Sequence, residues 1–415
     1  MSSDLKTTPL NPWHKQSGAN MASFGGYDMP LWYDTGVKKE HLAVLESAGL
    51  FDTSHMACIM VTGPDALALL QFCHTRELSG LKQGRCVYGA ILNEKGHVID
   101  DAIVYNFAPE TYMLCVNAGM GGAVSSHLLA QKQSRTVTIE DLTDQVAKVD
   151  IQGKNSARIL AKILHDPATV FGAMPYFSFK GHFLKGTDQP VQLLDKTDVL
   201  ISRSGYTGEF GFEIFVAPDK VVSLWESLLD AGKASGLIAC GLGARDSLRA
   251  GAGLPLSHQD VGERKFVNHP WMFALATTED GKGFTKEFLG KDALLDSADA
   301  PFTVPFVGEN LRKVGTGPDT QVIDASGKSI GMVLTCATDM GIGLHEGRIL
   351  SIASPDLPEG FKAKGLSCGF VLVDRQPNPG EKLVLQENKR KINVVVAGEI
   401  RPHRTARLKI TNFTG

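Results

Sequence analysis

Two adjacent aspartates, Asp100 and Asp101, interrupt an otherwise apolar stretch and could do acid–base chemistry. The surrounding segment, Tyr88–Tyr105, has a turn between two apolar runs, which predicts a pair of strands. Successive strand side chains point to opposite faces, so at least one aspartate must face an apolar side, where an unpartnered carboxylate is costly. The pattern leaves two interpretations open: a carboxylate held by backbone donors, or a functional acid.

A third carboxylate, Glu213, follows two turn glycines, Gly205 and Gly208. It alternates with Phe212 and Ile214 and should therefore point away from both. A carboxylate in such a place suits a ligand that offers two adjacent N–H groups, such as the amino-pyrimidinone edge of a pterin. By itself this pattern is a weak indication of a ligand.

A glycine-rich turn runs into a predicted helix over Cys240–Arg249. Helix N-termini favour anions, and Arg245 adds a charge that could bind a carboxylate. Arg249 is spaced to pair with Asp246 one turn earlier, and a surface ion pair of little energetic value is the alternative interpretation.

The elements that must position these residues follow from the hydrophobic pattern. The first 280 residues alternate short β-like runs with helical segments, whereas several short strands with turn signals follow further on and favour an all-β domain. We therefore predict a ligand-binding region over residues 1–280, a linker over 281–305 and a β-domain over 306–415. Within the last domain, Gly341–Gly365 is predicted to be a long loop or insertion. The clearest predicted helices are Val37–Ala48, Asp65–Cys73 and Asp219–Ala234, and the clearest predicted strands are Cys58–Val61, Tyr112–Val116, Gln321–Ile323, Ile330–Leu334, Gly369–Val373, Lys382–Leu385 and Ile392–Val396.

The composition excludes several classes of protein. The 415 residues carry a formal net charge of −3, which gives no general attraction to nucleic acid or to an anionic membrane. No apolar run is long enough to span a bilayer, and the first residues do not read as a secretory or transit signal, so we expect a cytoplasmic protein. The seven cysteines are scattered without a CxxC pair, and we predict neither disulfides nor a metal site.

Taken together and in order, the segments resemble the glycine cleavage T protein (aminomethyltransferase) family. The similarity is clear from about residue 8 to residue 340 and weak in the tail that follows. A single motif of this kind occurs in many proteins, but the whole set in this order is specific for the family. The segments that carry it are Phe24–Pro30, Phe51–Met56, Asn93–Asp101, Val116–Ala118, Ile151–Gly153, Gly205–Ile214, Gly241–Arg249 and Ile330–Val333.

The resemblance implies an α+β fold in a three-domain ring. A ferredoxin-like domain and a second α+β domain are interleaved, a C-terminal jelly-roll-like β-domain closes the ring, and tetrahydrofolate occupies the central channel. The family transfers a methylene carbon from an aminomethyl group on a lipoylated H protein to tetrahydrofolate and releases ammonia.

The resemblance also implies roles for individual residues. Asp101 matches the essential acid, and because Asp100 and Asp101 point to opposite strand faces, we expect Asp100 to be structural. The remaining matches are to folate-binding positions: Tyr88 and Tyr206 in the pterin cleft, Asn117 at the pterin, Glu213 at the pyrimidine ring and Arg245 near the glutamyl tail.

The sequence departs from the family pattern after Arg249. The family usually continues with Leu-Glu-Ala and a Tyr-Gly pair, where this sequence has Ala250–Ala252 and Ser257-His258. Further on, the family usually has a Gly-Leu-x-Trp run, where this sequence has Phe266–Phe273. Within the last of these, we predict that His269 and Trp271 reshape the entrance for the second substrate, although Trp271 could instead pack in the core. The sequence does not choose between Arg401 and Arg404 of the tail as a contact for folate.

These departures leave three hypotheses for the function. The first is aminomethyl transfer from a lipoylated H protein. The second is a tetrahydrofolate-dependent demethylase that acts on a small compound methylated at sulfur, oxygen or nitrogen. The third is a non-catalytic folate-binding paralogue, which the absence of a Lys-Gly-Cys-Tyr motif disfavours.

Overall fold

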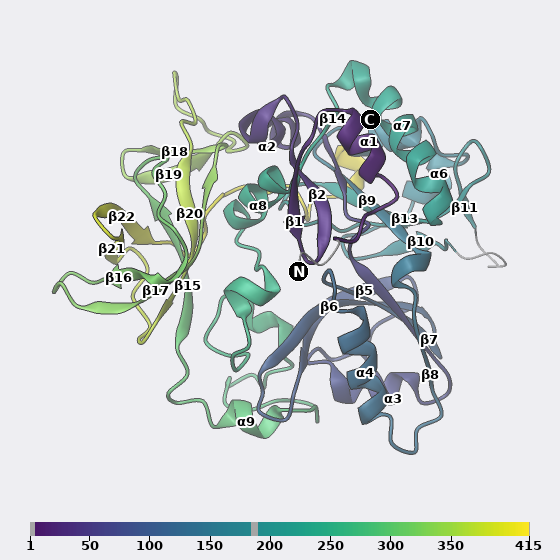
Figure 1. Cartoon of the computed structure of the whole chain (residues 1–415), viewed down its shortest axis with the longest axis horizontal. Helices are drawn as coiled ribbons and strands as arrows, with labels where there is room; N and C mark the ends of the chain where they lie inside the picture. Colours follow the sequence, from purple (N-terminus) through teal and green to yellow (C-terminus); the bar gives the residue numbers. More distant parts are fainter. Residues whose placement is uncertain (1–4, 184–189, 415) are drawn as a thin grey trace.

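The computed structural model describes residues 5–183 and 190–414, and its elements form two α/β units and one closed barrel (Figure 1). The mixed fold with a C-terminal β-domain is as predicted, and this domain is a six-stranded barrel. Among the described residues, no helix has both the length and the apolar character needed to cross a membrane.

The first α/β unit is built on a sheet with the order β10-β12-β13-β9-β3-β14, in which β11 also pairs with β12. Apolar residues of alternate strand positions fill its core together with the buried face of α7, which confirms the helix predicted over Asp219–Ala234. The strands are β3 (Gly49–Asp52), β9 (Ala147–Gln152), β10 (Phe179–Gly181), β11 (Val191–Gln192), β12 (Asp198–Ser202), β13 (Gly211–Val216) and β14 (Ile238–Ala239). The helices of this unit are α1 (Asn11–Gln16), α2 (Gly36–Glu46), α5 (Ser156–Ala161), α6 (Pro167–Phe171), α7 (Val221–Gly232) and α8 (Leu242–Gly251).

The second α/β unit lies, in the sequence, between β3 and β9 of the first. The two units are therefore interleaved, as expected. Its sheet has the order β5-β6-β7-β4-β8, with strands β4 (Ala57–Thr62), β5 (Arg85–Leu92), β6 (Val98–Ala108), β7 (Thr111–Val116) and β8 (Thr138–Asp141). Two helices pack against it, α3 (Ala66–Cys73) and α4 (Gly121–Gln131).

The barrel closes in the order β15-β20-β17-β16-β21-β22, with β22 pairing back onto β15. Its strands are β15 (Phe302–Gly308), β16 (Gly317–Ile323), β17 (Ser329–Asp339), β20 (Leu366–Val373), β21 (Lys382–Glu387) and β22 (Arg390–Val396). The barrel begins at Phe302, inside the predicted linker, because the pairing of β15 with β20 already starts at this residue. The predicted insertion Gly341–Gly365 contains a hairpin of β18 (Ile342–His345) and β19 (Arg348–Ser351).

The C-terminal tail leaves the barrel and returns to the first α/β unit. Phe413 stacks on Phe210 with ring centroids 4.0 Å apart, and the buried Arg401 pairs with Asp339 and Glu209. A single β-domain over residues 306–415 is therefore too simple a description, because the tail belongs to the core of another unit.

Helix α8 holds the central position between the units (Figure 1). It packs against α2, against β17 of the barrel, and against β2 (Tyr27–Trp32), which forms a hairpin with β1 (Asn20–Phe24). Residues that follow α8 lead through a π-helical turn, Ser257–Val261, and the short helix α9 (Lys291–Leu295) to the barrel. This path brings β6, β13 and α8, which carry the predicted site residues, to the middle of the molecule.

Candidate active site

The two aspartates lie in β6, the strand between β5 and β7. Asp101 pairs with Ala90 and Asp100 with Ile91, after which the register shifts. Asp100 is fully buried, whereas Asp101 is partly exposed. The two carboxylates therefore differ in exposure, as expected for neighbouring residues on opposite faces of a strand.

The side chain of Asn117 joins the two aspartates. Its Nδ2 donates to Asp100 Oδ1 at 2.7 Å and to Asp101 Oδ1 at 2.6 Å, and its backbone N–H donates to Asp100 Oδ2 at 2.9 Å. Strand alternation did not predict that one amide contacts both carboxylates. Asn117 lies just beyond Val116, the last β7 residue that pairs with β6, where its side chain is no longer confined to one face.

Asp101 has an environment suited to proton transfer. Tyr88 OH donates to its Oδ2 at 2.9 Å. Burial, followed by the charge of Asp100, raises the pKa of Asp101 to about 7, although the hydrogen bonds from Tyr88 and Asn117 act in the opposite direction. A carboxyl group with this pKa can both accept and return a proton near neutral pH.

The π-helical turn supplies two further contacts that the sequence analysis did not assign to the site. Ser257 Oγ donates to Asp100 Oδ1 at 2.9 Å, and His258 Nε2 lies 3.3 Å from the same oxygen. The sequence marked Ser257-His258 as unusual, but only the fold brings this turn to β6.

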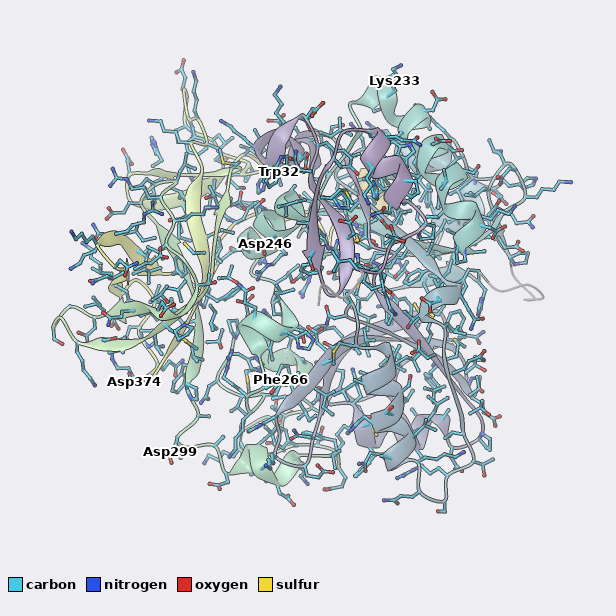
Figure 2. The ribbon with its side chains drawn as sticks, viewed as in Figure 1. Trp32, Lys233, Asp246, Phe266, Asp299 and Asp374 are labelled. Carbon is cyan, nitrogen blue, oxygen red and sulfur yellow. The ribbon has the colours of Figure 1, made fainter. Side chains whose placement is uncertain are left out.

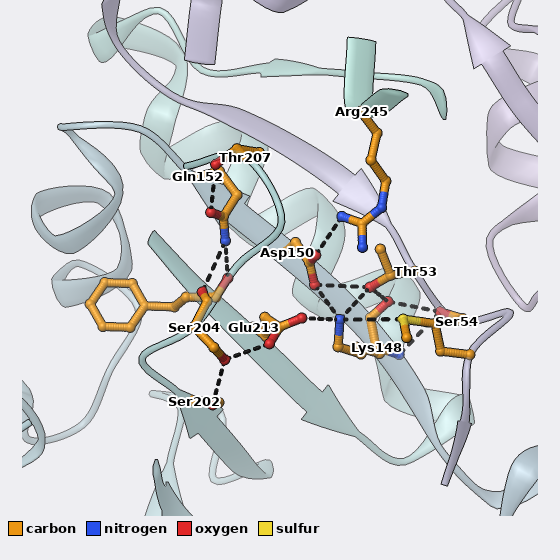
Figure 3. A network of polar contacts seen from close by, with 12 residues as sticks. Thr53, Ser54, Lys148, Asp150, Gln152, Ser202, Ser204, Thr207, Glu213 and Arg245 are labelled. Atoms are coloured by element: carbon orange, nitrogen blue, oxygen red, sulfur yellow. Dashed lines mark hydrogen bonds and ion pairs between the residues drawn. The ribbon is translucent and has the colours of Figure 1, made fainter. Parts of the chain in front are cut away.

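A second buried polar cluster lies on the face of the first sheet opposite to its apolar core (Figure 3). Glu213 in β13 pairs in register with Asp150 in β9, and its neighbours Phe212 and Ile214 are in the core, as the alternation predicts. Lys148, also in β9, is buried between the two carboxylates. The face that carries Glu213 is therefore a charged one.

Both oxygens of Glu213 have partners within the protein. Lys148 Nζ contacts Glu213 Oε1 at 2.5 Å and Asp150 Oδ1 at 2.7 Å, and Ser204 Oγ donates to Glu213 Oε2. The two carboxylates raise the pKa of Lys148 although burial opposes them. Lys148 is thus a buried cation that neutralises part of the charge on this face.

Arg245, in α8, extends the same cluster (Figure 3). Its Nη1 donates to Asp150 Oδ2 at 2.8 Å, and its guanidinium lies 4.8 Å from the centroid of the Tyr206 ring. The Tyr206 hydroxyl donates to the carbonyl of Pro255. Arg245 is therefore held in place by a carboxylate and an aromatic face. A guanidinium has five N–H donors, so the donors beyond the bond to Asp150 could bind an acceptor on a ligand.

Tyr206 lies within electrostatic reach of both clusters. The charge of Asp101 contributes to raising the pKa of Tyr206, and Tyr206 contributes to raising that of Tyr88, with burial the largest cause for both phenols. The six predicted acid and folate-binding positions are thus gathered in one region: Tyr88, Asp101, Asn117, Tyr206, Glu213 and Arg245.

The predicted entrance residues lie elsewhere in the structure. Trp271 is 2% exposed, donates from Nε1 to the carbonyl of Gly253, and packs against Phe370 of the barrel. His269 is also buried and stacks on Trp271. Phe266, labelled in Figure 2, belongs to the same apolar cluster, which joins the second α/β unit to the barrel. The interface between units buries both side chains, which favours the core packing that the sequence left open for Trp271, and a role of the pair at the entrance stays a prediction.

Lys148 and Asp150 are site residues that the sequence analysis missed. The alternation of Ala147, Val149 and Ile151 with charged residues was the available signal, since it places Lys148 and Asp150 on one non-core face.

Of the tail arginines, Arg401 is buried in its own ion pairs and Arg404 contacts Glu399.

No group of His, Cys, Asp and Glu among the described residues could hold a metal ion. The seven cysteines are free thiols, six of them buried.

Comparison with known proteins identifies the family to which the chain belongs. Residues 10–269 match the family model described as the GCVT N-terminal domain. An aminomethyltransferase of Halothermothrix orenii is 34% identical over 393 residues, which cover 94% of this chain and 97% of the relative. An aminomethyltransferase of Lysinibacillus sphaericus is 35% identical over 81% of this chain and 86% of the relative. The chain therefore belongs to the glycine cleavage T protein family.

A solved structure supports the same assignment over nearly the whole fold. The glycine cleavage system aminomethyltransferase T from Bartonella henselae is 28% identical and superimposes with a TM-score of 0.76. The match covers 95% of this chain and 97% of the other. The similarity therefore includes the barrel and the tail as well as the two interleaved units.

Proposed function

We propose that this protein is a tetrahydrofolate-dependent aminomethyltransferase that receives its aminomethyl group from a lipoylated H protein. Family membership and relatives named aminomethyltransferase support this reaction class. The observation that carries the proposal is the Asp101 carboxyl, which lies between a phenol and an amide and has a pKa of about 7. The cytoplasmic location stays a prediction from the sequence.

The proposed reaction needs a group that moves protons. The donor carbon forms bonds to N5 and N10 of the folate, and its bonds to the lipoyl sulfur and to the amine nitrogen break. The two folate N–H protons leave with the thiol and with the ammonium ion, so the step is balanced. Asp101 is placed to accept one of these protons and return it, and its carboxylate form favours positive charge that develops near the reacting carbon.

The residues around Asp101 also suit a reduced folate. Glu213 already accepts from Lys148 and Ser204, but each carboxylate oxygen can accept two hydrogen bonds, so pterin N–H groups can share it. Tyr88 and Tyr206 offer aromatic surface, and the Asn117 amide offers polar contacts. Arg245 keeps N–H groups beyond its bond to Asp150 for the carboxylate of the folate tail.

Replacing Glu213 tests the folate site. Glu213→Gln keeps the shape of the side chain but removes the charge, and we expect tetrahydrofolate binding to weaken by about 2–3 kcal/mol because a buried charge-assisted pair is lost. Isothermal titration calorimetry measures the affinity.

Glu209→Gln is the matched control, because Glu209 is a buried carboxylate of the neighbouring turn that pairs with Arg401. We expect it to lower the melting temperature without changing folate affinity. Equal folate affinity in Glu213→Gln and wild type would remove Glu213 from the binding site.

A turnover assay with defined donors tests the reaction itself. With tetrahydrofolate and aminomethylated H protein, we expect equal amounts of methylenetetrahydrofolate and ammonia. Turnover that requires a small methylated sulfur, oxygen or nitrogen compound instead would replace the proposal with a demethylase. Folate binding without turnover of any donor would identify a non-catalytic folate-binding protein.

A further inference from the structure

His258 lies at the solvent end of the aspartate pair. Its side chain is 48% exposed, whereas the Asp100 carboxylate that its Nε2 contacts at 3.3 Å is fully buried. The imidazole therefore extends from solvent to a carboxylate that solvent does not reach. A histidine is the side chain whose ordinary pKa allows it to gain and lose a proton near neutral pH.

The turn that carries His258 is fixed by buried contacts. Ser257 Oγ donates to Asp100 Oδ1, and Thr335 Oγ1 of the barrel donates to Asp260 Oδ1 at 2.6 Å. Arg249 forms an ion pair with the other oxygen of Asp260. The turn is π-helical, a rare conformation that often occurs at functional sites. Its position at β6 is therefore set by both the barrel and α8.

Hydrogen-bonding groups connect His258 to Asp101 without a break. The Asp100 Oδ1 atom that His258 approaches also accepts from Asn117 Nδ2, and the same Nδ2 donates to Asp101 Oδ1. Asp100 is thus the intermediary between the exposed imidazole and the carboxyl that faces the proposed reaction.

We propose that His258 is a positioning residue that acts on Asp101 through Asp100, by holding a positive charge beside the two carboxylates and exchanging protons with solvent at this end of the pair. The inference rests on the proposed function of Asp101. Two adjacent carboxylates disfavour each other's charge, and a nearby cation offsets part of that repulsion. His258 thereby keeps Asp101 ionised to a lower pH than the pair alone would allow.

The surrounding charges agree with this role. The hydrogen bond to Asp100 is the largest cause that raises the pKa of His258; burial opposes it, and the charges of Asp100, Asp101 and Glu263 raise it further. In return, the charge of His258 lowers the pKa of Asp101. His258 therefore interacts with three carboxylates.

Three further titratable groups near the aspartate pair are paired or neutral. Asp260 of the same turn is paired with Arg249 of α8. Burial is the largest cause that raises the pKa of Tyr88 and of Tyr206, so both phenols stay protonated near neutral pH. His258 thus offers a partly exposed imidazole that can hold a positive charge beside the pair.

The test is the pH dependence of kcat/KM in His258→Gln. Without the cation the pKa of Asp101 rises, so a larger fraction of it is protonated at a given pH. We expect the acidic limb of the profile to move upward by about half a pH unit or more. His258→Lys should move the limb back toward the wild-type position, because a lysine restores the charge. His345→Gln, on the barrel hairpin, is the control and should leave the profile unchanged.

A second measurement does not depend on turnover. In full-length protein with labelled histidine, the imidazole signal that is missing from His258→Gln is followed by NMR against pH. Its pKa should lie above that of an ordinary histidine and should fall in Asp101→Asn, because a negative neighbour is removed.

The two measurements separate the two ideas. Coupled titration in a protein without turnover would support the His258–Asp101 link and contradict the proposed function. Normal turnover, an unmoved acidic limb and a His258 pKa that ignores Asp101→Asn would overturn the link while leaving the proposed function intact. A limb that shifts in His258→Gln but is not restored by His258→Lys would assign the effect to lost structure and also overturn it.

Discussion

Asp101→Asn is expected to lower kcat by roughly 10³-fold while tetrahydrofolate still binds, because the variant keeps the size of the side chain but cannot take up a proton. Steady-state turnover and calorimetric binding measure the two effects. The variant should also show a different pH dependence of stability. The folded pKa of Asp101, about 7, lies above its ordinary value of 3.8, so the wild type loses stability as the pH rises through this window. Asp101→Asn should lack that loss.

Asp100→Asn is the matched control for this prediction. Asp100 accepts from the Asn117 backbone and amide and from Ser257, so an asparagine there would set an N–H group against one of these donors. We expect a lower melting temperature and a smaller loss of turnover than in Asp101→Asn. A folded, inactive Asp100→Asn beside a fully active Asp101→Asn would exchange the roles of the two aspartates.

Lys148→Met is expected to reduce the free energy of unfolding at pH 7 by about 3–5 kcal/mol, because removing one member of a buried ion pair leaves its partners uncompensated. Lys148 contacts both Glu213 and Asp150. In the variant Asp150 retains Arg245, whereas Glu213 loses the one cation that contacts it in the described part of the chain. Urea unfolding followed at several pH values measures the loss.

The loss should be smaller at low pH. Protonating an uncompensated buried carboxylate removes its charge, so the variant should gain stability relative to wild type as the pH falls. Adding Glu213→Gln to Lys148→Met should recover part of the stability at pH 7, because the unpaired charge is gone.

Lys286→Met provides a control for burial alone. Lys286 is also buried, but its Nζ donates to Gln71 and to the carbonyls of His74 and Arg76 and not to a carboxylate. Its loss should not diminish as the pH falls toward 5. A Lys148→Met variant as stable as wild type at pH 7 would show that the two carboxylates do not need this cation.

The sequence by itself determined the features that depend on local periodicity and motif order. The alternation of Phe212, Glu213 and Ile214 placed the carboxylate on the non-core face, and the hydrophobic pattern of Asp219–Ala234 predicted helix α7. These predictions succeeded because side-chain direction in a strand or helix follows from its geometry alone. The ordered motifs similarly indicated the family before any contact was known.

The tertiary structure decided which polar groups meet. The Lys148–Glu213 contact joins residues 65 positions apart, and the Ser257–Asp100 contact joins residues 157 positions apart. Such contacts depend on strand register and on the packing of units, which no local pattern encodes. The same reason explains why Trp271 packs in an interface between units and why the tail after the barrel packs against the first unit.

The chemistry of Asp101 shows the division most clearly. The sequence placed a carboxylate in an apolar strand and left its role open between a structural and a functional acid. The burial, the adjacent Asp100 charge and the hydrogen bonds from Tyr88 and Asn117 together set its pKa, and all but the adjacent charge arise from segments brought together by folding. A pKa depends on the three-dimensional distribution of charge and solvent, so the reactivity of this residue is a property of the fold.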